Sequence, residues 1–97
     1  MNLLIPPTMP DRRITGYAFH RRFSNEEAIA IDLASFGETV EAAGLRRYQK
    51  MLDLAQFVNL DEPYVREGVE ALAVMGLIAP ERVTEIMDAP VTVDEWP

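Results

Sequence analysis

Residues 61–76 repeat apolar side chains at three- and four-residue steps, the spacing of a helix that buries one face. The positions expected to face inward are Val65, Val69, Leu72 and Met75. Asp61 suits the N-cap because its carboxylate can accept a hydrogen bond from a free amide, and Pro63 suits the first turn. Gly76 predicts the end of the helix, since glycine readily adopts the left-handed conformation that closes a helix.

A second apolar run follows this helix directly. Pro80 is expected at the first helical position, which makes Ala79 the N-cap, although alanine is a poor cap. The side chains expected to face inward are Val83, Ile86 and Met87. Residues 61–89 therefore predict a helical hairpin. Gly68 falls beside the buried face of the first helix, where the missing side chain would let another helix approach closely.

An earlier helix begins with the clearest signal in the chain, the capping box Ser24-Asn-Glu-Glu27. In this motif each side chain satisfies the other residue's free amide. Gly37 is expected to end the helix in the left-handed conformation. One apolar face is formed by Ile29, Leu33 and Phe36. Ile31 lies off that face, so we expect this helix to be buried on more than one side.

A further helix is expected over residues 39–57, with Thr39 as its cap. The apolar positions that recur at helical spacing are Tyr48, Met51, Leu52, Ala55 and Val58. Gly44 lowers helix stability by about 1 kcal/mol relative to alanine, so a break at this position is an alternative. For the preceding segment a short helix over 15–22 capped by Thr15 is favoured, and a strand remains open.

The two ends of the chain carry prolines, which fix the backbone and remove amide donors. The predicted organisation is an extended N-terminal arm (1–13), a helical domain (14–89) and an extended C-terminal tail (90–97). The fold class is all-α: a compact bundle of four to five short helices that ends in a helical hairpin. The apolar triplet Leu3-Leu4-Ile5 either folds back on the core or docks on another chain.

Charge is distributed unevenly along the 97 residues, whose net charge is −7. Residues 1–50 hold seven basic and six acidic side chains, whereas residues 51–97 hold two and ten. The hairpin lies in the acidic part, which phosphate backbones would repel, so we expect no nucleic-acid binding. No apolar run approaches the roughly 18 residues of a membrane span, so no membrane role is expected.

The chain offers few residues for catalysis or metal binding. It has no cysteine and a single histidine, His20, which is followed by Arg21 and Arg22. The carboxylate pair Glu67 and Glu70 is better explained as a solvated helix face than as an acid–base pair. The glycines are isolated and form no phosphate-binding loop. We therefore expect no catalytic, cofactor-binding or metal-binding residues, and no enzymatic activity.

Partner contacts are instead expected at the ends of the chain and around the first helix. Paired arginines bracket that helix and could form an electrostatic docking face. Apolar groups at both termini could reach along a neighbour. The predicted partner-binding residues are Leu3, Leu4, Ile5, Arg12, Arg13, Arg21, Arg22 and Trp96.

The ordered helix signals over about residues 13–91 resemble those of small uncharacterised proteins of tailed bacteriophages and prophages, encoded in or beside the tail gene cluster. The likeness rests on Arg22–Glu27, Asn59–Pro63, the Gly76-Leu77 turn and Pro80–Arg82. Relatives often have Ser or Thr where this chain has Ala79. The resemblance implies a phage-encoded protein and supplies no catalytic residues.

Two functions follow as expectations. The first is a small tail or tail-tip-associated component of the virion, made in the host cytoplasm, whose helical body binds larger tail proteins. The alternative is a soluble phage-encoded inhibitor of a host protein, acting through its acidic half. An assembly chaperone for a tail protein is a weaker third reading, and self-association stays open.

Overall fold

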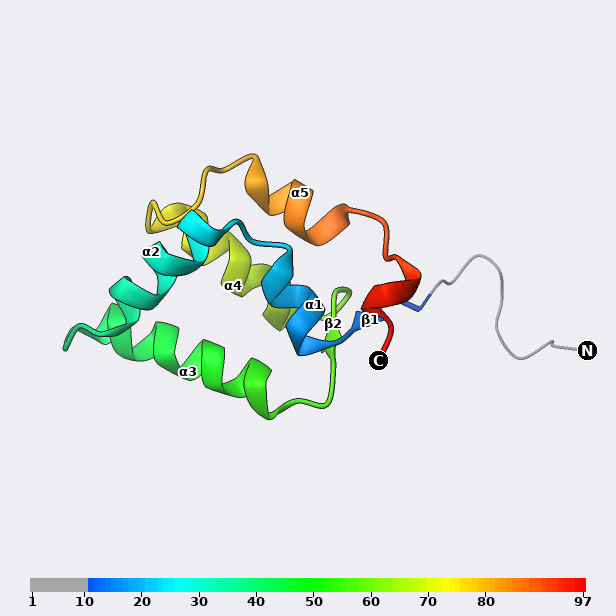
Figure 1. Ribbon diagram of the computed structural model, residues 1–97. Helices are drawn as coiled ribbons and strands as arrows, with labels where there is room; N and C mark the ends of the chain where they lie inside the picture. Colours follow the sequence, from blue (N-terminus) through cyan, green and yellow to red (C-terminus); the bar gives the residue numbers. More distant parts are fainter. Residues whose placement is uncertain (1–10) are drawn as a thin grey trace, which may run out of the picture.

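The computed structural model describes residues 11–97, which fold into five helices, a two-stranded sheet and a final 3₁₀ turn (Figure 1). The helices are α1 (Gly16–Arg21), α2 (Asn25–Ser35), α3 (Val40–Leu54), α4 (Pro63–Val74) and α5 (Arg82–Asp88). The remaining elements are β1 (Arg13–Ile14), β2 (Val58–Asn59) and η1 (Val93–Glu95). The predicted mainly helical fold is confirmed. No helix among the described residues combines the length and apolarity that a membrane span requires.

The small sheet joins the beginning of the described chain to its middle. β1 and β2 run antiparallel, with Arg13 opposite Asn59 and Ile14 opposite Val58. Ile14 and Val58 are almost fully buried, so this pairing closes one end of the core. Both alternatives for residues 14–22 are thus partly right: a strand ends at Ile14 and a helix begins at Gly16. The helix expected over 39–57 ends earlier, at Leu54, because the chain must extend to form β2.

Three predicted helix starts are confirmed by side-chain hydrogen bonds. The Ser24 hydroxyl accepts from the Glu27 amide at 3.1 Å, and the Glu27 carboxylate accepts from the Ser24 amide at 2.7 Å. Thr15 and Thr39 accept from the amides three residues later, at 3.0 and 3.1 Å. Helix α3 continues through Gly44 without a break. Local capping chemistry is therefore a reliable guide to where these helices begin.

The end of α2 was predicted wrongly. Among the described residues, the glycine with a positive φ is Gly76, at 79°. The φ angle of Gly37 is not positive. Helix α2 stops at Ser35, and Arg46 from α3 donates hydrogen bonds to the carbonyls of Ser35 (2.7 Å) and Gly37 (2.6 Å). A side chain from the next helix satisfies the carbonyl groups that a left-handed glycine would otherwise have served.

The predicted hairpin is present, with shifted boundaries. Gly76 ends α4 as expected. The N-cap position of α4 is Glu62, not Asp61, and no side chain caps it. Helix α5 begins at Arg82, two residues after Pro80, because the amides of Arg82 and Val83 first bond to carbonyls three residues back in a tighter turn. Met75 is 38% exposed, so its expected inward position is wrong.

The C-terminal tail also departs from the extended form expected for residues 90–97. Thr92 and Glu95 form a second capping box around the turn η1. The amide of Thr15, just after β1, donates to the carbonyl of Glu95 at 2.9 Å. Both ends of the described chain therefore meet beside α1 (Figure 1).

A single hydrophobic core lies among the helices and the sheet. Its largest fully buried side chains are Phe19, Ile14, Ile86, Met87, Val58, Val65 and Val69. Of the predicted α3 positions, Leu52 and Val58 are buried and Tyr48 is partly buried, whereas Met51 and Ala55 are exposed. Every buried side-chain polar atom among the described residues has a hydrogen-bond partner.

Helix α2 faces the core with the opposite side from the one its apolar pattern suggested. Ile31, which lies off the predicted face, is 8% exposed and belongs to the core. Ile29, Leu33 and Phe36 are 51%, 66% and 77% exposed. These three residues share one side of the helix through their spacing, and we refer to them as the α2 outer face. Val40, 84% exposed at the start of α3, follows this face in sequence.

Candidate functional site

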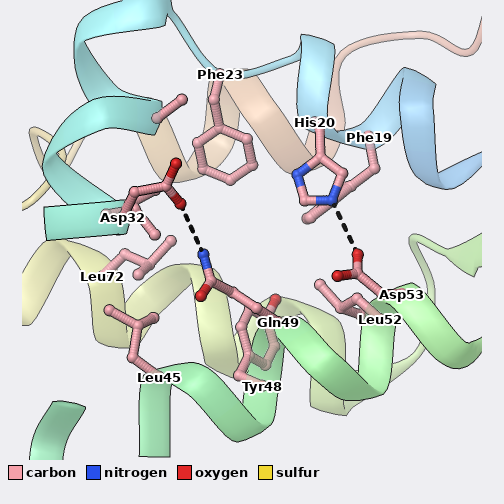
Figure 2. Close-up of a pocket in the computed structure, with 12 residues that line it drawn as sticks. Phe19, His20, Phe23, Asp32, Leu45, Tyr48, Gln49, Leu52, Asp53 and Leu72 are labelled. Carbon is pink, nitrogen blue, oxygen red and sulfur yellow. Dashed lines mark hydrogen bonds and ion pairs between the residues drawn. The ribbon is translucent and has the colours of Figure 1, made fainter. Parts of the chain in front are cut away.

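A cleft of about 340 Å³ opens between α1, α2 and α3 on the core side of α2 (Figure 2). Its floor is apolar and is lined by side chains from four helices and from the connection between α1 and α2: Phe19, Phe23, Ile31, Leu45, Leu52 and Leu72. Polar side chains stand at its mouth: His20, Asp32, Gln49 and Asp53. An apolar hollow bordered by a few polar groups is the usual form of a binding pocket, and this volume lies at the lower end of that range.

The polar groups at the mouth form two bridges across the cleft (Figure 2). The amide of Gln49 donates to the Asp32 carboxylate at 3.4 Å, which joins α3 to α2. His20 Nε2 lies 3.4 Å from the Asp53 carboxylate, which joins α1 to α3. Both distances are at the long end for a hydrogen bond, and both carboxylates face solvent. Each bridge can therefore be exchanged for a contact to a ligand at little cost.

The far wall of the cleft is fixed by a close contact between α3 and α4. Gly68 packs directly against the Tyr48 ring, and a methyl group added at Gly68 would fall 2.0 Å from Tyr48 Cε1. The Tyr48 hydroxyl donates to the carbonyl of Val65 at 2.8 Å. Burial, and secondarily the nearby Tyr64, raise the pKa of Tyr48, so it stays a neutral donor. The close helix approach predicted at Gly68 is confirmed.

We next asked whether the acidic residues and the histidine of the cleft could bind a metal ion. Among residues 11–97 no three His, Asp or Glu side chains are placed to hold a metal ion together. What the cleft offers chemically is an apolar hollow with a weakly held carboxylate on either side.

The predicted partner-binding arginines are placed in different ways. Arg12 bonds to the Asp61 carboxylate at 3.0 Å and also donates to the carbonyl of Met87. Arg13 pairs with Asp11 at 2.9 Å. Its guanidinium lies 5.0 Å from the centre of the Phe57 ring. Hydrogen bonds from Arg13 lower the pKa of Asp11 to about 2. The guanidinium groups of both arginines therefore donate hydrogen bonds to groups of the same chain.

Arg22 makes most of its contacts within the fold, and its predicted role in partner binding stays a prediction. Its side chain is 8% exposed and pairs with Glu95 at 2.9 Å. The guanidinium also donates to the carbonyls of Ile86 (2.7 Å) and Ala89 (3.2 Å) at the end of α5. Arg22 thus fastens α1, α5 and η1 together. Its neighbour Arg21 is exposed, with its guanidinium 5.7 Å from the centre of the Tyr17 ring.

A second ion pair between distant segments could not be predicted from any local sequence pattern. Arg82 in α5 meets Glu27 in α2 through two hydrogen bonds of 2.8 and 3.0 Å. Arg82 also donates to the carbonyl of Arg22 at 3.0 Å. The hydrogen bond from Arg82 is the main cause that lowers the pKa of Glu27. Glu27 could be recognised as part of a capping box, but no local pattern reveals a partner 55 residues away.

The apolar members of the predicted partner-binding set lie at the chain ends. Leu3, Leu4 and Ile5 fall outside the described residues. Trp96 is 59% exposed and lines a groove at the end of the molecule where the chain starts and stops. The structure brings Trp96 near Arg12 and Arg13 in that groove, and it places Arg21 and Arg22 along a different surface.

Comparisons with protein-family models, with curated proteins and with solved structures gave no match to this chain.

Proposed function

We propose that this protein is a non-enzymatic component of a bacteriophage tail, synthesised in the host cytoplasm, that binds a larger tail protein through the α2 outer face. The phage assignment rests on the resemblance of the helix signals described above. The binding assignment rests on one structural observation: α2 presents Ile29, Leu33 and Phe36 to solvent while its core contact is made by Ile31.

The α2 outer face has the character of an interface in the isolated chain. Single exposed apolar residues are ordinary on protein surfaces, but several on one helix face mark a contact site. Leu33 and Phe36 are exposed by two thirds or more, and Val40 continues the series. Covering these groups would remove apolar area from water, which is the main driving force of association.

Charge around this face defines the partner further. Glu26, Glu38 and Glu41 flank the α2 outer face in sequence and are exposed. They would favour a partner whose apolar surface is bordered by lysine or arginine, because complementary charge speeds association and selects the partner. In the second half of the chain, some of the negative charge is neutralised by ion pairs with arginines. The paired carboxylates are Asp61, Asp88 and Glu95.

The test is incorporation into phage particles. Mass spectrometry of purified particles should detect the protein, and a Leu33→Ser/Phe36→Ser variant should be strongly depleted from them. Val74→Ser is the matched control, because Val74 is 89% exposed on α4, and this variant should be incorporated normally. Both variants should keep the parent melting temperature, since exposed substitutions change stability by only about 0.5 kcal/mol.

Two results would count against the proposal. Particles that lack the protein would exclude a virion component, and normal incorporation of the double variant would exclude the α2 outer face. The alternative of a host-protein inhibitor predicts a stoichiometric host partner on pull-down from infected cells. Release of that partner by salt would point to the acidic half of the chain.

A further inference from the structure

The cleft of Figure 2 has no part in the function proposed above, which places the tail protein on the α2 outer face. Among the described residues that line the cleft, none belongs to that face. Helix α2 lines the cleft with Ile31, which points to the core side of the helix. A ligand in the cleft and a partner on the outer face therefore do not compete for the same side chains.

The apolar part of the cleft combines aromatic and aliphatic side chains. Phe19 and Phe23 meet edge to face, with 5.5 Å between their ring centroids, and Tyr48 closes the far wall. The remaining floor is aliphatic. Aromatic rings pack well against one another edge to face or offset, so a ring of a ligand would find matching surfaces here. The volume of about 340 Å³ limits the occupant to a small molecule.

The charge at the mouth of the cleft favours a cation. Figure 2 shows Asp32 and Asp53 on opposite sides of the opening, and no lysine or arginine in the described part of the chain lines the cleft. Their present partners, Gln49 and His20, lie 3.4 Å away. An ammonium group donates to a carboxylate at about 2.8 Å, so it would compete well with both. An anionic ligand would be repelled by both carboxylates.

We propose that this cleft binds a small organic cation, which consists of an ammonium group on a short apolar body that carries a ring. The ring lies on the apolar floor, and the ammonium group donates to Asp32, Asp53 or both, in place of the bridges at the mouth. Burial of the ring supplies most of the affinity. The carboxylates face solvent, so their charge contributes mainly to the selection of the ligand.

Three probes of nearly equal size test this selection on the isolated protein: phenethylamine, phenethyl alcohol and phenylacetate. In a nuclear magnetic resonance titration, the methyl signals of Ile31 and Leu45 and the side-chain amide signal of Gln49 should move. The methyl signals of Val74, which is exposed on α4 outside the cleft, should not. Phenethylamine should bind about fivefold more tightly than the alcohol, and added salt should reduce this preference. Phenylacetate should bind most weakly.

The two carboxylates are tested by the double variant Asp32→Asn/Asp53→Asn. Asparagine keeps the shape of the side chain and removes its charge, so the variant should bind phenethylamine and phenethyl alcohol equally. Both positions are exposed, and we expect the fold to be retained. Glu67→Gln is the matched control, because it removes an exposed carboxylate of α4 outside the cleft and should leave the preference at the parent value.

A second pair of variants tests the location of the site through its shape. Ala28 lines the cleft from α2 and is partly buried, so Ala28→Leu places a larger side chain in the hollow. This variant should weaken the binding of phenethylamine and of the alcohol alike. Ala43→Leu, at an exposed position of α3 outside the cleft, should bind both as the parent does. Circular dichroism shows whether each variant keeps its helices.

Three outcomes would overturn the proposal. Signals of Ile31 and Leu45 that stay in place with phenethylamine would exclude the cleft as its site. Equal affinity of the parent for the amine and the alcohol would exclude selection by charge. Tighter binding of butylamine, whose chain resembles that of lysine, would assign the cleft to a lysine side chain of a partner protein instead. All of these measurements can fail while the particle test succeeds, and the reverse.

Discussion

At the scale of single residues, Gly44 in α3 and Gly68 in α4 have opposite roles. Gly68 has the Tyr48 ring where a side chain would be, whereas the corresponding space at Gly44 is empty within 4 Å. Gly68→Ala should lower the free energy of unfolding by about 1–3 kcal/mol, because Tyr48 must move and lose its bond to Val65. Gly44→Ala should raise it by about 1 kcal/mol through helix propensity. Thermal or urea unfolding of both variants measures this, and destabilisation by both would contradict the packing described.

The adjacent arginines at the end of α1 give a second contrast at this scale. Arg22→Ala removes the partner of the largely buried Glu95 and the donors to two α5 carbonyls, so stability should fall by about 3 kcal/mol. Arg21→Ala should change stability by no more than about 0.5 kcal/mol, because that side chain is exposed. Urea midpoints compare the two, and similar midpoints would show that Arg22 is not a fastening group.

At the scale of elements, α2 shows which part of an apolar pattern forms the core. Ile31→Ala should cost about 2–4 kcal/mol, because Ile31 is buried with the core. Ile29→Ala removes the same atoms from a side chain that is 51% exposed and should cost far less. The difference is measured by thermal unfolding of the isolated protein. Equal losses would mean that the α2 outer face is covered in the free protein.

Helix starts and helix faces differed in how well they could be predicted. The starts at Thr15, Ser24 and Thr39 depend on atoms within three residues, so the sequence contains the whole cause. The end of α2 depends on Arg46, which belongs to another helix. Which face of α2 packs against the core depends on the apolar side chains that other helices place next to it. The cleft could not be predicted for the same reason, because its lining residues come from helices that only the fold brings together.

At the scale of the whole molecule, ion pairs between distant segments tie stability to pH. Glu27 bonded to Arg82 and Glu95 bonded to Arg22 both have folded-state pKa values below the ordinary 4.5. Their contribution is therefore complete at pH values above about 4.5 and is lost as the pH falls through the folded pKa. The melting temperature should drop on acidification in this range, and Glu27→Gln should be less stable at pH 7 with a shallower acid slope.

The control for this pH series is Glu67→Gln. Glu67 is an exposed carboxylate for which the described residues provide no ion pair. Its removal should leave the acid slope at the parent value. An unchanged slope for Glu27→Gln as well would mean that the link between α2 and α5 does not contribute to acid sensitivity.

The sequence by itself determined the helical class, the capped helix starts, the turn at Gly76 and the close approach at Gly68, because each depends on local backbone preferences or on a missing side chain. Tertiary structure alone decided that Arg22 fastens the fold, that Arg82 meets Glu27 and that Ile31 rather than Leu33 enters the core. A long charged or apolar side chain can meet several partners. Which one it meets is fixed only when distant helices pack, since packing sets the distances and the burial on which its energy depends.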